Sequence, residues 1–194
     1  MTRTVNKNRL IYQAKSFYNA AINLERIDRE SGDLLFLTPT IVNAAFSIEI
    51  TLKAILTCEG ITYENEHNIM VLYSLLPESA QALIWKWVWT KAPEYDVEKC
   101  VRELILISDA FKQWRYSFED GIKPALDTRF LMCFANAAIG TMFELGYNVD
   151  VTPVGTEMST DEIERVERMY EDNRREAIEK NLAYIRRKLG TPAQ

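Results

Sequence analysis

The sequence has few of the residues that break helices. Its 194 residues include only 7 glycines and 6 prolines, about half of the roughly 12% share that is usual in globular proteins. So few breakers in a chain of this length favour long helices over a β fold with many turns. Apolar residues make up 47% of the chain and charged residues 26%, a balance typical of a folded domain.

The chain also has almost no histidine and none of the common catalytic or nucleotide-binding motifs. His67 is the only histidine, which excludes a histidine-rich metal site and leaves one candidate for any Ser-His-Asp arrangement, without a supporting serine motif. The patterns GxxxxGK[ST], GxGxxG, HExxH and GxSxG are missing. We therefore expect neither a metal nor a cofactor.

The three cysteines form no close pair, and each lies in or beside an apolar stretch: Cys58, Cys100 and Cys133. We expect buried free thiols in a reducing cytoplasm. The N-terminus lacks the apolar core of a signal peptide. The longest uncharged runs, residues 34–48 and 130–143, are shorter than the ~18–20 residues that span a bilayer. These features predict a soluble cytoplasmic protein.

The charge balance is mildly acidic. The chain has 23 basic and 28 acidic side chains, giving a formal net charge of −5. This balance argues against a protein that coats nucleic acid with positive charge, although it leaves room for a local basic site.

Apolar periodicity predicts an all-α fold, a bundle of four to five core helices with an additional long C-terminal helix. Residues 78–90 are ambiguous between helix and strand because three tryptophans alternate there, but a lone strand could not satisfy its backbone, so we predict a helix. The predicted division is a bundle over 1–147, a linker over 148–158 and a charged amphipathic helix over 159–194. The bundle helices are expected over residues 7–29, 39–59, 78–90, 96–119 and 125–145, with a short apolar segment ending at residue 76.

The C-terminal segment begins with a capping box, Ser159 to Glu162. It carries eight acidic and eight basic residues between Asp161 and Lys188, so it is neutral overall. A narrow apolar stripe runs along it. We expect this helix to reach Leu189 and to pack one seam on the core or on a second copy.

Two charges stand out in the most apolar helix. Glu49 and Lys53 are the only charged residues between Thr38 and Cys58, and their i, i+4 spacing lets them pair. They form either a structural ion pair or part of a functional site. Arg115, in the aromatic run FKQWRYSFED, either pairs internally with Glu119 or Glu49, or contacts a phosphate or base in a partly buried cleft. We predict that Glu49, Lys53 and Arg115 converge.

His67 lies where a loop leads into a short helix, close to Glu64 and Glu66. It serves as a helix cap or bonds a neighbouring carboxylate; as a general acid or base it would need partners from other helices. The full candidate site consists of Glu49, Lys53, His67, Arg115, Tyr116 and Glu119. The cluster of Trp85, Trp87 and Trp89 could stack bases, fill the core or form an oligomer contact. We expect some of the four tryptophans to line a two-fold interface.

Three stretches in this order, NAAFSIEITLKAIL, EHNIMVLYSLLP and FKQWRYSFED, resemble bacterial proteins of the HEPN superfamily. The resembling region runs from about Lys7 to Leu145. It implies a small helical bundle, often a homodimer, of the kind found in toxin–antitoxin and phage-defence systems and near nucleotidyltransferases. It also makes an antitoxin or a nucleotidyltransferase a possible partner.

Many active HEPN members are metal-independent ribonucleases with an arginine followed, after four to six residues, by a histidine. Here Asp120, Gly121 and Ile122 stand where that histidine would fall after Arg115. Whether the chain is an enzyme therefore stays open. Two hypotheses follow. The first is a HEPN-like protein that binds RNA or a nucleotide, as a ribonuclease toxin or a phage-defence component. The second is a non-catalytic scaffold that dimerises or binds a partner.

Overall fold

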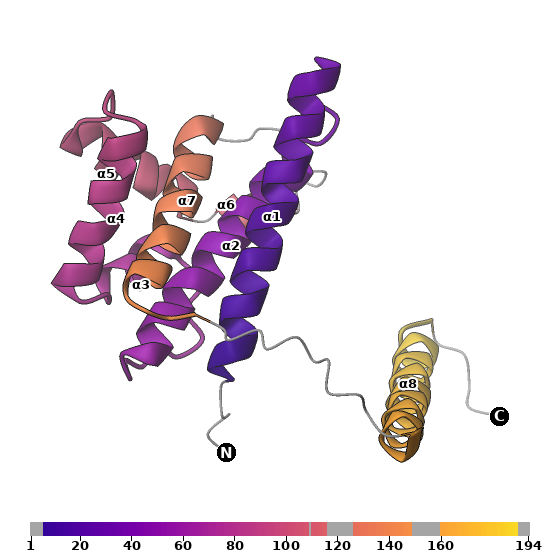
Figure 1. Cartoon of the computed structure of the whole chain (residues 1–194). Helices are drawn as coiled ribbons and strands as arrows, with labels where there is room; N and C mark the ends of the chain where they lie inside the picture. Colours follow the sequence, from indigo (N-terminus) through magenta and orange to yellow (C-terminus); the bar gives the residue numbers. More distant parts are fainter. Residues whose placement is uncertain (1–5, 109, 116–125, 149–159, 190–194) are drawn as a thin grey trace. The chain divides into compact units, whose positions relative to one another are not determined.

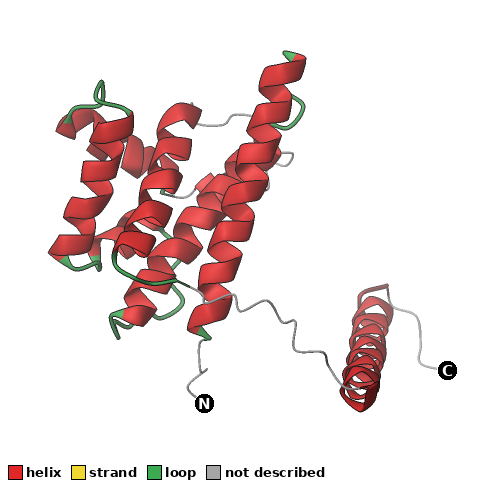
Figure 2. Ribbon diagram, in the orientation of Figure 1, coloured by secondary structure: helices red, strands yellow, loops and turns green. Residues whose placement is uncertain are grey.

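The computed structural model describes residues 6–108, 110–115, 126–148 and 160–189. These residues form helices joined by loops, without a strand among them (Figures 1 and 2). The predicted all-α class is confirmed. The helices are α1 (Lys7–Ser31), α2 (Leu37–Cys58), α3 (Ile69–Ser74), α4 (Glu78–Lys91), α5 (Val97–Ile107), α6 (Ala110–Arg115), α7 (Thr128–Glu144) and α8 (Thr160–Leu189).

The chain divides into two compact units, Met1–Val149 and Asp150–Gln194. The described part of the second unit is α8, a helix of 30 residues, so the predicted C-terminal helix is present. Ser159, the expected cap, lies outside the described residues. The first unit contains every candidate site residue.

Helix α2 is the centre of the first unit. It is apolar on nearly all sides, and most of its residues are buried, because α1 packs along one side and α3, α6 and α7 cover others (Figure 1). Among the described residues it is the one helix long and apolar enough to cross a membrane, by length and composition alone, and 67% of the relevant window is buried in the structure. Such burial is the pattern of a core helix.

Residues 78–91 form helix α4, which confirms the prediction of a helix rather than a strand. Trp85 stacks on Trp89 and meets the ring of Phe134 edge-on. Trp87 donates from its indole nitrogen to Glu144 at 2.9 Å. Trp85 and Trp87 thus contact α7, while the buried residues of α4 are Ala80, Ile84 and Val88. Whether any tryptophan lines a two-fold interface stays a prediction.

The single helix predicted over residues 96–119 is wrong. Helix α5 ends at Ile107, and α6 begins at Ala110. The carbonyl oxygen of Ser108 accepts a hydrogen bond from the backbone N–H of Ile69, at 3.0 Å. In an uninterrupted helix that oxygen would accept from the amide four residues later, so this bond to α3 accompanies the break. Residues 116–119 lie outside the described residues.

Local caps set several helix boundaries. Asn68, Asp96 and Asp127 each accept a backbone N–H in the first turn of α3, α5 and α7. Gly146, which follows the end of α7, has a φ of 80°, which only glycine adopts without strain. Asp127 also accepts from the hydroxyl of Tyr95 at 2.7 Å.

The three cysteines are free thiols, as expected. Cys100 is buried, and the other two are half-buried. Burial raises the pKa of each thiol, so near neutral pH these side chains act as small apolar groups rather than as nucleophiles.

Candidate functional site

Glu49 and Lys53 lie one turn apart on α2, and the structure pairs them. Lys53 Nζ donates to Glu49 Oε1 at 2.7 Å, with side chains that are 13% and 3% exposed. Removing two charges from water is costly, so such a pair persists only where its geometry is good. The short contact and the i, i+4 spacing supply that geometry.

His67 joins this pair from the loop that precedes α3. Its Nδ1 lies 2.8 Å from Glu49 Oε1 and 3.5 Å from Lys53 Nζ. The imidazole is nevertheless 71% exposed. A single carboxylate oxygen therefore accepts from both a buried ammonium group and an exposed ring.

The loop is held in place by Glu66. One of its carboxylate oxygens accepts the backbone N–H groups of His67 and Asn68, each at 2.7 Å, and these bonds lower the pKa of the Glu66 carboxyl. Asn68 in turn caps α3. The prediction that His67 caps a helix or bonds a neighbouring carboxylate is thus refined: its ring bonds Glu49, 18 residues earlier, and its neighbour Glu66 takes its backbone amide.

The second oxygen of Glu49, Oε2, is buried, and among the described residues it accepts no hydrogen bond. A buried carboxylate oxygen without a partner is unfavourable by about 1–3 kcal/mol. Helix α6, which ends at Arg115, packs against α2. The side chain of Arg115, and all of Tyr116 and Glu119, lie outside the described residues. The convergence of Arg115 on Glu49 and Lys53 therefore stays a prediction.

The surroundings of His67 are acidic. A hollow beside the loop is lined by residues 62–66 together with Val71 and Leu75, and it carries Glu64 and Glu66. Lys53 Nζ is 5.8 Å from the centre of the Tyr63 ring. Two carboxylates, Glu64 and Glu66, thus lie at the hollow, and Lys53 lies near Tyr63, which also lines it. Among the described residues, this balance disfavours a phosphate at the hollow.

The arrangement has one element of acid–base chemistry. A carboxylate that accepts Nδ1–H fixes the tautomer of a histidine and leaves Nε2 as a base. A base also needs a nucleophile or an acid within hydrogen-bond reach. Within the described segments, the side-chain partners of the ring are Glu49 and Lys53. The same segments contain no group of three residues able to hold a metal ion.

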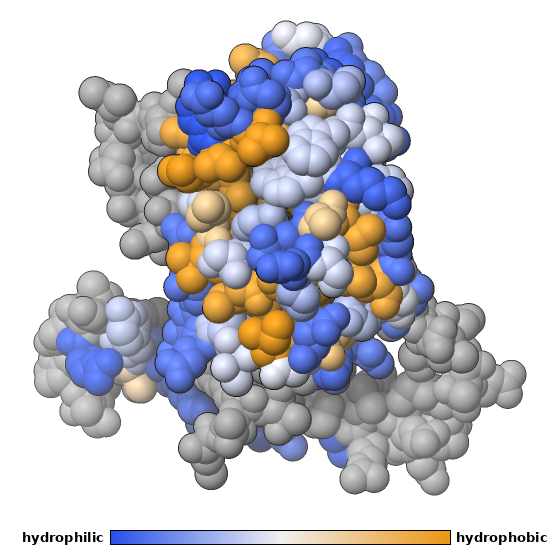
Figure 3. Space-filling model, turned by 90° about the vertical axis from the view of Figure 1, so that its left-hand side faces the viewer, coloured by the Kyte–Doolittle hydropathy of each residue, from blue (hydrophilic) through white to orange (hydrophobic). Residues whose placement is uncertain are grey.

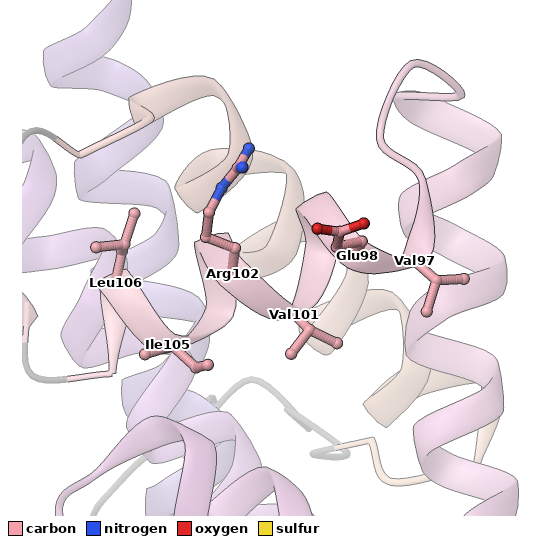
Figure 4. A pocket seen from close by; sticks show the side chains of 6 residues that line it. All are labelled: Val97, Glu98, Val101, Arg102, Ile105 and Leu106. Carbon is pink, nitrogen blue, oxygen red and sulfur yellow. The ribbon is translucent and has the colours of Figure 1, made fainter.

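A second feature, which the sequence analysis missed, lies on α5. Val97, Val101 and Ile105 recur every four residues and are 63%, 39% and 57% exposed. With three further residues of α5 they line a shallow hollow of about 610 Å³ (Figure 4): Glu98, Arg102 and Leu106. Apolar areas also lie open between polar ones on the side of the molecule that carries α4 and α5 (Figures 1 and 3).

The opposite face of α5 is the buried one. Cys100, Leu104 and Ile107 are buried there, where α5 contacts α3 and α6. The sequence did contain a sign of the exposed ridge: Val97 and Val101 belong to a stripe beside the main apolar face of residues 96–119. On the short α5 these two side chains are exposed, whereas Leu104 and Ser108, which continue the same stripe, are buried.

Comparisons of the chain with protein-family models, with curated proteins and with solved structures find no match. The geometry of the two features above therefore carries the functional argument.

Proposed function

We propose that this chain is a non-catalytic helical module that binds a protein partner through the exposed face of α5. The observation that carries the proposal is the ridge formed by Val97, Val101 and Ile105. Single exposed apolar residues are ordinary on protein surfaces. Three of them in line, on a helix otherwise built to bury its apolar residues, mark an interaction surface.

The chemistry around Glu49 supports the same proposal. Lys53 and His67 both bond Oε1 of that carboxylate, so the network serves to neutralise a buried charge and to hold the loop before α3. The sequence also has no histidine in the stretch after Arg115 where active HEPN ribonucleases carry one. A structural network with a binding face fits these residues better than an active site.

Site-specific photo-crosslinking tests the proposal. A photoreactive amino acid is placed at Ile105, and in a matched control at Tyr12, a similarly exposed position on α1. The protein is irradiated in cells of its natural source, and adducts are identified by mass spectrometry. We expect a defined protein adduct from position 105 and not from position 12. No adduct at either position, or equal adducts at both, would refute the proposal.

A second candidate function is RNA or nucleotide binding, with metal-independent RNA cleavage in a cytoplasmic toxin–antitoxin or phage-defence setting. The observation in its favour is the Glu49–His67 contact, which leaves the exposed Nε2 of His67 free to act as a base. Helix α6, which contains Arg115, packs on the helix that carries Glu49.

This second function is tested by incubating the purified protein with total cellular RNA in the presence of a chelator. Cleavage that Arg115→Ala and His67→Ala each abolish would support it. RNA left intact, or cleavage that survives both substitutions, would rule it out.

A further inference from the structure

We propose that the partner of the α5 face is a second copy of the same chain, with the two α5 helices packed antiparallel about a two-fold axis. This inference rests on the proposed function, because it takes the α5 face as the binding surface.

The spacing of the ridge allows it to interdigitate with itself. Positions along the helix axis can be measured from the level of Cys100, at a rise of ~1.5 Å per residue. Val97 lies ~4.5 Å before that level, Val101 lies ~1.5 Å after it, and Ile105 lies ~7.5 Å after it. A two-fold axis at that level reverses these positions in the partner. The six apolar side chains then alternate between the two copies about every 3 Å. Val97 and Val101 each fill the gap between two side chains of the other copy, and Ile105 lies at the end of the row.

The charges favour the same arrangement. Glu98 and Arg102 lie on one flank of the ridge (Figure 4), ~3 Å before and ~3 Å after the level of Cys100. The two-fold axis therefore sets Glu98 opposite the partner's Arg102, twice per dimer. In a parallel pair the two-fold axis would run along the helices and would place the two charged flanks on opposite sides of the interface, so Glu98 and Arg102 of the two copies could not pair.

Arg102 is available for such a contact. In the monomer its Nε lies 3.7 Å from Glu103 Oε1, and its side chain is 62% exposed, so only a weak ion pair is exchanged for the new one. One exposed helix face is smaller than the ~800 Å² per partner of a standard interface. We therefore expect a weak dimer, with dissociation in the micromolar range.

Sedimentation velocity of the full chain from about 5 to 200 µM tests the proposal. The wild type should shift from 22.5 kDa towards twice that mass. Val101→Glu places a charge beside the two-fold axis and should weaken association at least ~10-fold. Circular dichroism checks that each variant keeps its helix content.

Charge reversal tests the register. Glu98→Arg alone and Arg102→Glu alone should each weaken the dimer about tenfold, because each sets like charges opposite one another twice. Combining the two should restore it. The matched control swaps an exposed i, i+4 pair on α1, Arg26 and Glu30, and should leave the dissociation constant unchanged.

Each outcome decides between the two proposals. Restoration by the double swap supports the antiparallel pair. A dimer that ignores Val101→Glu, or a double swap that fails to restore it, overturns the pairing. A monomer at all concentrations, together with a crosslink from position 105 to a different protein, overturns self-association and leaves the proposed function standing. A monomer that yields no crosslink overturns both.

Discussion

Removing the ammonium group of Lys53 should destabilise the fold far more than removing one from the surface. Lys53 Nζ lies 2.7 Å from Glu49 Oε1, and the two side chains are 13% and 3% exposed. Lys53→Met keeps the aliphatic stem but deletes the charge, which leaves His67 as the partner of the buried carboxylate among the described residues. Breaking a buried pair in this way typically destabilises by ~3–5 kcal/mol. Because His67 still donates to Oε1, we expect a value near the lower end, about 3 kcal/mol.

The matched control is Lys86→Met. Lys86 Nζ lies 2.9 Å from Glu144 Oε1, a similar contact, but its side chain is 64% exposed. Water already solvates both charges of that pair, so its loss should lower the free energy of unfolding by less than ~1 kcal/mol. Both variants are unfolded in urea and followed by circular dichroism at 222 nm, with the wild type in the same buffer.

A third variant separates the charge from the packing. Glu49→Leu combined with Lys53→Met removes both charges and should recover stability to within ~1–2 kcal/mol of the wild type. If Lys53→Met destabilises no more than Lys86→Met, burial does not strengthen this pair and the reasoning is wrong. A double variant less stable than Lys53→Met would mean that Glu49 has a structural role beyond neutralising Lys53.

Three further predictions follow from particular contacts. A methyl group at Gly140 would lie 3.0 Å from the ring of Trp87, so Gly140→Ala should destabilise by about 1 kcal/mol in urea despite its gain in helix propensity. Burial and a hydrogen bond to Glu59 raise the pKa of Tyr147 from 10.0 to about 12. The stability that this hydroxyl adds is complete below pH 10 and is lost as the pH rises through 12. The variant Tyr147→Phe should therefore show a smaller fall in the free energy of unfolding over that alkaline range. Although burial opposes the shift, hydrogen bonds lower the pKa of Asp127 below 3.8. The stabilisation that this carboxylate adds is therefore present above that pH and is lost below it. The variant Asp127→Asn should lose less stability than the wild type on acidification from pH 5 to pH 2.

The sequence could predict a contact in the site only where the two residues are close together in the chain. The contact between Glu49 and Lys53 follows from the i, i+4 geometry of any helix, so the sequence was sufficient to predict it. The ring of His67 reaches Glu49 across 18 residues. Its position depends on where the loop before α3 crosses α2, and carboxylates nearer in sequence, Glu64 and Glu66, were equally reasonable partners beforehand.

The break between α5 and α6 shows the same limit for the fold. The apolar rhythm of residues 96–119 continues through Ser108, and neither glycine nor proline interrupts it before Gly121. The bond that accompanies the break joins the carbonyl of Ser108 to the amide of Ile69 in another element, and a tertiary hydrogen bond leaves no mark on local periodicity.

Under the function proposed above, that break matters for partner binding. In a continuous helix, one apolar face packs into the core, and the residues beside that face lie at its edge. Because α5 ends at Ile107, its buried side is formed by Cys100, Leu104 and Ile107. Val97 and Val101, together with Ile105, form a separate exposed ridge. The same Ser108 contact that docks α5 against α3 therefore fixes the direction in which the ridge faces. Substitutions that disturb this contact should change partner binding before they unfold the core around α2.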